Sequence, residues 1–74
     1  MPKLPILKPK QVVKMFEKLG FRQLRQKGSH VILRNQEGGQ RIVVPLHVKD
    51  MPIGTLRSII RQSGVDKNDF LKIR

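Results

Sequence analysis

The apolar positions near the start of the chain recur at the spacing of one helical face. Between residues 10 and 19 that face consists of Val12, Phe16 and Leu19, while lysines and a glutamate lie outside it. Pro9 fits the first turn of such a helix, where its missing N–H costs nothing. Gly20 follows the last apolar position and is a common helix stop. The pattern therefore predicts an amphipathic helix over residues 10–19.

A second helical pattern is expected from about residue 52 to residue 63, and Gly64 is a natural stop for it. After this glycine, Asp66 and Asp69 have the spacing of a capping arrangement. Phe70 and the apolar residues after it can then form a last short helix that packs back on the domain. The apolar face of the second helix consists of Ile53, Leu56, Ile59 and Ile60.

Three short segments between these helices have the apolar and β-branched content that is typical of strands. They are expected at 21–26, 30–34 and 41–45, separated by a turn at residues 27–28 and a glycine-containing loop at 35–40. Two successive hairpins make a three-stranded antiparallel meander. We therefore expect an α+β fold of the order α-β-β-β-α, with two helices packed on one face of the sheet. This is the plan of the double-stranded-RNA-binding fold.

The length allows a single domain over residues 1–74, with residues 1–7 as an extended N-terminal arm. Alternation within the second strand predicts which face each side chain occupies. If Val31 and Leu33 are buried under the helices, His30 and Arg34 are exposed together on the other face, and Ile32 is half-exposed between them. The opposite choice would bury the Arg34 cation, so we favour the first.

Charge is the strongest global feature of the composition. Sixteen lysines and arginines oppose five acidic residues, which gives a net charge of +11 and a pI near 11.4. Such a surface attracts polyanions, and nucleic acid is the partner that we favour. The chain has three phenylalanines and neither tyrosine nor tryptophan, so we expect contacts to phosphates and to shape rather than a platform of aromatic rings.

Other features of the composition exclude several classes. The chain has no cysteine, which excludes disulfide scaffolds and zinc sites made of thiolates. No apolar run approaches the roughly 20 residues of a membrane span, and the first residues lack the apolar segment of a signal peptide. We therefore expect a cytoplasmic protein without a membrane partner. The histidines are far apart and the acidic residues are scattered, so we expect no metal site and no cofactor.

Candidate chemistry lies in the segment RQKGSH. His30 can take or give a proton near neutral pH, and Arg25, Lys27 and Arg34 are cations within a few residues of it. Gly28 allows close approach of another backbone or of a phosphate, and the hydroxyl of Ser29 can form hydrogen bonds. On this pattern alone, three interpretations of His30 remain open. It can be an exposed polar residue of a strand, a phosphate contact or a proton-transfer group.

Several motifs resemble the HicA family of toxins from bacterial type II toxin–antitoxin systems. They are LGF and QKGSH, then VVPLH, then GTLRSIIRQSG, and their order and spacing agree with the family from about residue 9 to residue 70. The resemblance implies the double-stranded-RNA-binding-like fold and an endoribonuclease that cleaves messenger RNA. It also implies a HicB-like antitoxin that neutralises the toxin by covering the histidine of the glycine-containing motif.

Carried over to this chain, the resemblance makes His30 the catalytic candidate, preceded by Gly28 and Ser29. His47 matches the second histidine position and is a candidate second proton carrier. The GTLR motif is read as structural, with Thr55 as a helix cap and Leu56 in the core. The RNA-binding candidates are Arg25, Lys27, Gly28, Ser29 and Arg34.

The expected function is therefore a metal-independent endoribonuclease that is a monomer alone or a hetero-oligomer with its antitoxin. One alternative is a non-catalytic module that binds double-stranded or structured RNA; it predicts binding that weakens steeply with salt, and no cleavage. The other is a protein-interaction domain whose basic face meets an acidic partner; it predicts no RNA binding at moderate salt. The histidine in its glycine motif is the feature that neither alternative requires.

Overall fold

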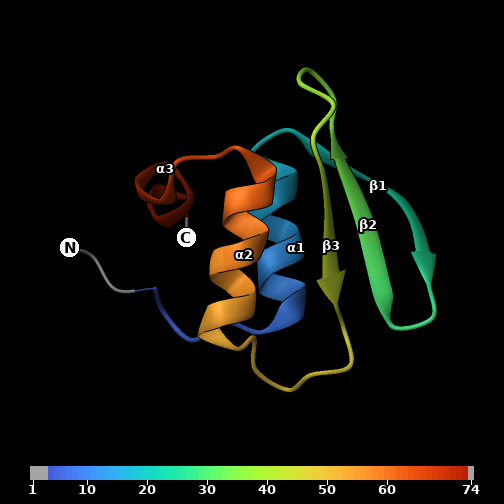
Figure 1. Ribbon diagram of the computed structural model, residues 1–74, viewed down its shortest axis with the longest axis vertical. Helices are drawn as coiled ribbons and strands as arrows, with labels where there is room; N and C mark the ends of the chain where they lie inside the picture. The colour runs from blue at the N-terminus through green and yellow to red at the C-terminus, as the bar shows by residue number, and fades with distance from the viewer. Residues whose placement is uncertain (1–3, 74) are drawn as a thin grey trace.

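A computed structural model describes residues 4–73 and has the predicted α+β architecture. The observed order is α-β-β-β-α-α, and the last helix is the short C-terminal helix that the sequence predicts (Figure 1). Each observed boundary lies within a residue or two of its predicted position. The elements are α1 (Pro9–Lys18), β1 (Phe21–Lys27), β2 (His30–Asn35), β3 (Arg41–Pro45), α2 (Ile53–Ser63) and α3 (Lys67–Lys72).

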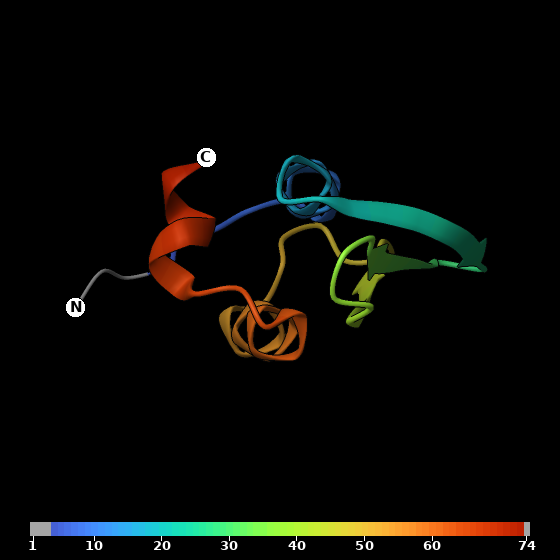
Figure 2. The ribbon, with the colours of Figure 1, turned by 90° about the horizontal axis from the view of Figure 1, so that it is seen from above.

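The sheet has the strand order β1-β2-β3, and both pairs are antiparallel, so β2 is the central strand. Helices α1 and α2 lie side by side on one side of the sheet, and α3 lies beyond them (Figures 1 and 2). The opposite face of the sheet carries no helix. The two amphipathic helices therefore cover a single face, as their apolar stripes require.

A single apolar core fills the space between the sheet and the helices. Its aromatic centre is Phe16, whose ring meets Phe21 edge-on at a centroid distance of 5.3 Å and Phe70 at 5.1 Å. Such pairs add stability beyond the area that they bury. The buried apolar residues are Leu7, Val12, Val13, Met15, Phe16, Phe21, Val31, Leu33, Ile42, Val44, Met51, Leu56, Ile59, Ile60 and Phe70.

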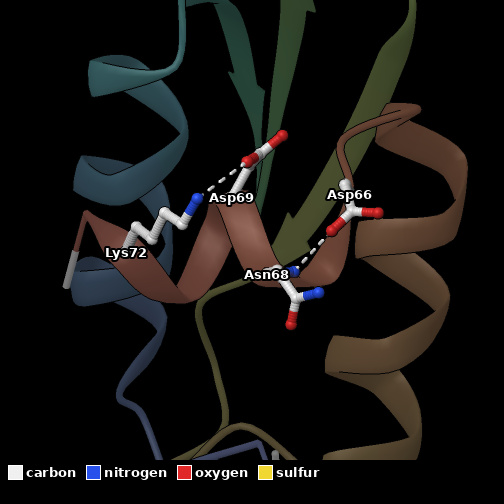
Figure 3. A network of polar contacts seen from close by, with 4 residues as sticks. All are labelled: Asp66, Asn68, Asp69 and Lys72. Carbon is white, nitrogen blue, oxygen red and sulfur yellow. Dashed lines mark hydrogen bonds and ion pairs between the residues drawn. The ribbon is translucent and has the colours of Figure 1, made fainter.

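Helix α3 attaches the C-terminal segment to this core. Asp66 caps the helix, because its carboxylate accepts a hydrogen bond from the backbone N–H of Asn68 at 2.8 Å (Figure 3). The ion pair between Lys72 and Asp69 spans 3.9 Å and is exposed, so it adds little stability. Phe70 is fully buried and packs on Phe16. The predicted packing of this helix against the domain is confirmed.

Helix α2 begins where the sequence predicts it, but its cap differs from the expectation. The helix begins at Ile53, Pro52 is its N-cap residue, and no side chain forms a cap hydrogen bond there. Thr55 therefore lies within the first turn and is not a cap, because Pro52 occupies the N-cap position. Leu56 is fully buried, as expected.

The part of the N-terminal arm from residue 4 onward is joined to the domain, and residues 1–3 lie outside the described range. Leu7 is buried, and its carbonyl accepts a hydrogen bond from the N–H of Met51 at 2.7 Å. This bond connects the arm to the segment between β3 and α2. The arm therefore supports the segment that contains His47.

Candidate nucleic-acid interface

The helix-free side of the sheet, which we call the open face, carries the side chains that alternation assigned to it. Val31 and Leu33 are 3% and 0% exposed and lie toward the helices. His30 and Arg34 are exposed, and Ile32 between them is half-buried. The predicted choice of faces for β2 is therefore confirmed. Ile32 has no helix above it because it lies on this outer side.

Strand pairing arranges the open face in three rows that cross the sheet, since directly opposite residues point to the same side. The histidine row is Lys27–His30–Pro45. The apolar row is Arg25–Ile32–Val43, and its Val43 is 43% exposed. The arginine row at the far end is Arg22–Arg34–Arg41.

A bulge in β1 keeps its cations on the open face. The pairing with β2 shifts between Gln23 and Arg25, so that Leu24 is an extra residue. With regular alternation, Arg25 and Lys27 would share the face of the buried Phe21. The bulge restores them to the outward side and leaves Leu24 47% exposed beside Arg22. The bulge thus decides the position of two of the predicted RNA-binding residues.

The turn between β1 and β2 explains the glycine before the histidine. Gly28 has φ +60°, as the first central residue of a type II′ hairpin turn requires. A Cβ at this position would have no heavy atom within 4 Å, so the requirement is conformational rather than steric. The side-chain amide of Gln26 donates a hydrogen bond to the backbone carbonyl of Gly28 at 3.0 Å and supports the turn. Gly28 and Ser29 therefore fix the backbone from which His30 projects.

The same turn brings His47 to His30. Pro45 lies opposite His30 and has no N–H to donate. The next N–H, that of Leu46, donates to the carbonyl of Ser29 at 2.6 Å and continues the pairing beyond the strand. His47 follows directly, and its ring centroid lies 5.7 Å from that of His30, with an angle of 51° between the planes. Both side chains are exposed.

The sequence-predicted residues fall into two groups. Lys27, Gly28, Ser29, His30 and His47 gather at one end of the open face, and Arg25 lies one row away. Arg34 is not part of this group, because it lies four residues along β2, which corresponds to about 14 Å. It lies in a different row of the open face.

Sequence reasoning missed Arg22 and Arg41. Pairing β2 and β3 outward from their loop would have placed Arg41 beside Arg34, whereas Arg22 faces Arg34 only because of the bulge at Leu24. A hollow of about 360 Å³ lies at this end and is lined by Arg22, Leu24, Arg34 and Gln36.

The open face is cationic without local compensation. Its rows contain five cations and no carboxylate, and within residues 4–73 none of the five forms an ion pair. The same part of the chain holds no group of three histidine, cysteine, aspartate or glutamate side chains that could bind a metal ion. No helix among these residues is long and apolar enough to cross a membrane. The cations are Arg22, Arg25, Lys27, Arg34 and Arg41.

Comparison with known proteins identifies the family of the chain. A search of curated proteins gives no match. Residues 9–65 match the sequence model of the family described as HicA toxin of bacterial toxin–antitoxin. The matched region runs from the start of α1 to just beyond α2, and it contains the whole sheet, the glycine turn and both histidines. The chain therefore belongs to the HicA family of bacterial toxins.

Proposed function

We propose that this toxin is an endoribonuclease that cleaves messenger RNA without a metal ion, using His30 and His47 as its proton carriers. The observation that carries the proposal is the 5.7 Å separation of the two rings on an open cationic surface. Rings whose centroids lie this close allow a single group, such as a phosphate, to come within hydrogen-bond reach of a nitrogen of each ring. Membership of the family adds the toxin–antitoxin context.

RNA supplies its own nucleophile for such a reaction. One neutral imidazole accepts the proton of a ribose 2′-hydroxyl as its oxygen forms a bond to the adjacent phosphorus. The bond between phosphorus and the 5′-oxygen breaks, and the second imidazole, in its protonated form, donates a proton to that oxygen. The products are a 2′,3′-cyclic phosphate and a free 5′-hydroxyl. Histidine suits both roles because its ordinary pKa lies near working pH, and each role contributes about 10²- to 10⁴-fold.

Lys27 is the cation best placed to hold the reacting phosphate. It lies directly opposite His30 in the β1–β2 pairing, with Cβ atoms about 5 Å apart in such pairs. Its ammonium group can stabilise the negative charge that develops on the phosphate oxygens. Arg25 in the next row can contact a neighbouring phosphate. Gly28 leaves the space before His30 free of side-chain atoms, so that the RNA backbone can approach.

The test is to compare His30→Ala and His47→Ala with the wild type on a long RNA. Each variant should lose at least a hundredfold in cleavage rate while keeping its circular dichroism spectrum and its affinity for RNA, and His30→Ala should relieve growth toxicity. RNA with a 2′-deoxy nucleotide at the cut position should resist the wild type. Undiminished cleavage by His30→Ala would remove the assignment. Cleavage of the deoxy substrate would exclude internal attack.

We propose that a HicB-like antitoxin neutralises the toxin by covering the open face. A cationic surface without its own carboxylates favours a partner that supplies them, and the charges would speed association. The complex should weaken as salt rises between 0.1 and 0.5 M, measured by titration calorimetry with the cognate antitoxin. A dissociation constant that is independent of salt would show that apolar contacts hold the complex instead.

A further inference from the structure

The arginine row is an arrangement that the fold alone does not favour. Arg34 lies directly opposite Arg22 on one side and Arg41 on the other. Like charges that face one another across a sheet destabilise it. Within residues 4–73 no carboxylate lies within ion-pair distance of the three side chains. Unfavourable local choices of this kind are typical of functional sites, and an anion bound across the row would turn the repulsion into attraction.

The row also has the form of an anion site. Arg22 and Arg34 line the hollow of about 360 Å³ together with Leu24 and Gln36, so two arginines border one space. The guanidinium of Arg34 lies against Gly39, because a Cβ at that glycine would come within 3.3 Å of Nη2. Gly39 has φ +78° and is thus suited to glycine. The turn between β2 and β3 therefore leaves space for this guanidinium.

We infer that the arginine row binds a backbone phosphate of the same RNA strand that is cut at the histidine row. The inference rests on the proposed nuclease function and adds a second anchoring point to it. Guanidinium groups recognise phosphate through paired hydrogen bonds, which gives geometric specificity as well as charge. The RNA strand would then lie along β2, with the half-exposed Ile32 and Val43 between its two anchored phosphates.

The distance between the rows sets the spacing of these phosphates. Four residues of strand separate His30 from Arg34, which is about 14 Å. A stacked strand advances about 3.4 Å per nucleotide, so the anchored phosphate lies about four nucleotides from the cut. An unstacked strand covers more distance per nucleotide and would place it about two nucleotides away. Substrates shorter than this cannot reach the row.

The experiment uses His30→Ala protein, which should bind RNA without cutting it, and synthetic oligoribonucleotides of about ten nucleotides, a usual footprint for single strands. In each oligonucleotide one phosphate is replaced by a neutral methylphosphonate. Replacement of the phosphate that the arginine row binds should raise the dissociation constant about tenfold to a hundredfold, as expected for the loss of a charge-assisted contact. The same replacement should have a much smaller effect when Arg22 and Arg41 are both changed to alanine.

The matched control is the double change Arg57→Ala and Arg61→Ala, which removes the same charge from exposed positions of α2. This control should keep the full effect of the methylphosphonate. Equal behaviour of the two double variants would overturn the inference. The inference would also be refuted if changing Arg22 and Arg41 to alanine weakened only the binding of the antitoxin, because the row would then be a contact for that protein. A wild type that cuts no RNA would refute the nuclease proposal. The effect of the methylphosphonate on the two double variants would still show whether the arginine row binds a phosphate.

Discussion

If RNA binds the open face as proposed, the number of cations on this face sets the salt dependence of the binding. Five cations project from its three rows, namely Arg22, Arg25, Lys27, Arg34 and Arg41. Each phosphate that a protein neutralises on a single strand changes the slope of log K against log salt by about −0.7. If the RNA contacts only this face, the slope should be about −3.5. A doubling of salt then weakens binding about tenfold.

The alternative is that RNA contacts the whole basic surface. The chain has sixteen lysines and arginines, and most of them lie on helices and loops rather than on the open face. Contact with all sixteen would give a slope near −11 by the same rule. The expected slope of log K against log salt therefore differs about threefold between the two alternatives, and this slope is easily measured.

The assay is fluorescence anisotropy of a labelled single-stranded RNA, titrated with His30→Ala protein at several salt concentrations between 0.1 and 0.4 M. Arg25→Ala should reduce the slope to about −2.8, because one phosphate contact is lost. Arg57→Ala, which removes the same charge from α2, should leave the slope unchanged. A slope steeper than about −7, or equal effects of the two variants, would refute the assignment of the open face as the RNA surface.

Two further predictions concern the fold that carries the site. Phe70→Ala removes a fully buried ring that packs on Phe16, so urea denaturation should show a loss of about 3–5 kcal/mol, out of a total of about 4–11 kcal/mol for a domain of this length; a loss below 1 kcal/mol would place α3 outside the core. Gly28→Ala places a Cβ on a residue with φ +60° where no atom of a more distant residue lies within 4 Å. The strained backbone alone should cost about 1–2 kcal/mol, and displacement of His30 should lower the rate of the proposed cleavage. Gly54→Ala, at an unstrained helical position with open space around it, should cause neither loss, and equal losses in both variants would contradict the turn argument.

The elements that could be predicted from the sequence are those set by local pattern. Alternation in β2 placed Val31 inside and His30 outside, because one choice buried an arginine and the other did not. Gly20 and Gly64 marked helix ends, and both have positive φ in the structure. The family resemblance identified His30 as the catalytic candidate and His47 as a candidate second proton carrier. These predictions needed only neighbours in sequence or a motif.

The arrangement that depends on long-range contacts could not be predicted in the same way. The approach of His47 to His30 depends on the hydrogen bond from Leu46 to Ser29, which joins residues seventeen positions apart. The arginine row depends on the pairing register and on the bulge at Leu24. Bulges have no clear pattern in a strand that mixes apolar and polar residues. Arg34 was therefore grouped with His30 by sequence distance, although it lies at the other end of β2.

The burial of Phe70 has a consequence for how the toxin comes into being. Every other member of the core precedes this residue in the chain, so it is the last of them to leave the ribosome. Domains acquire their structure as units during translation, and this one gains its full stability only when α3 has emerged and docked. The time needed to translate the final helix separates the appearance of the histidines from the completion of the scaffold that holds them. The candidate site thus reaches its full stability only after Phe70, which lies well beyond both histidines in the chain, has joined the core.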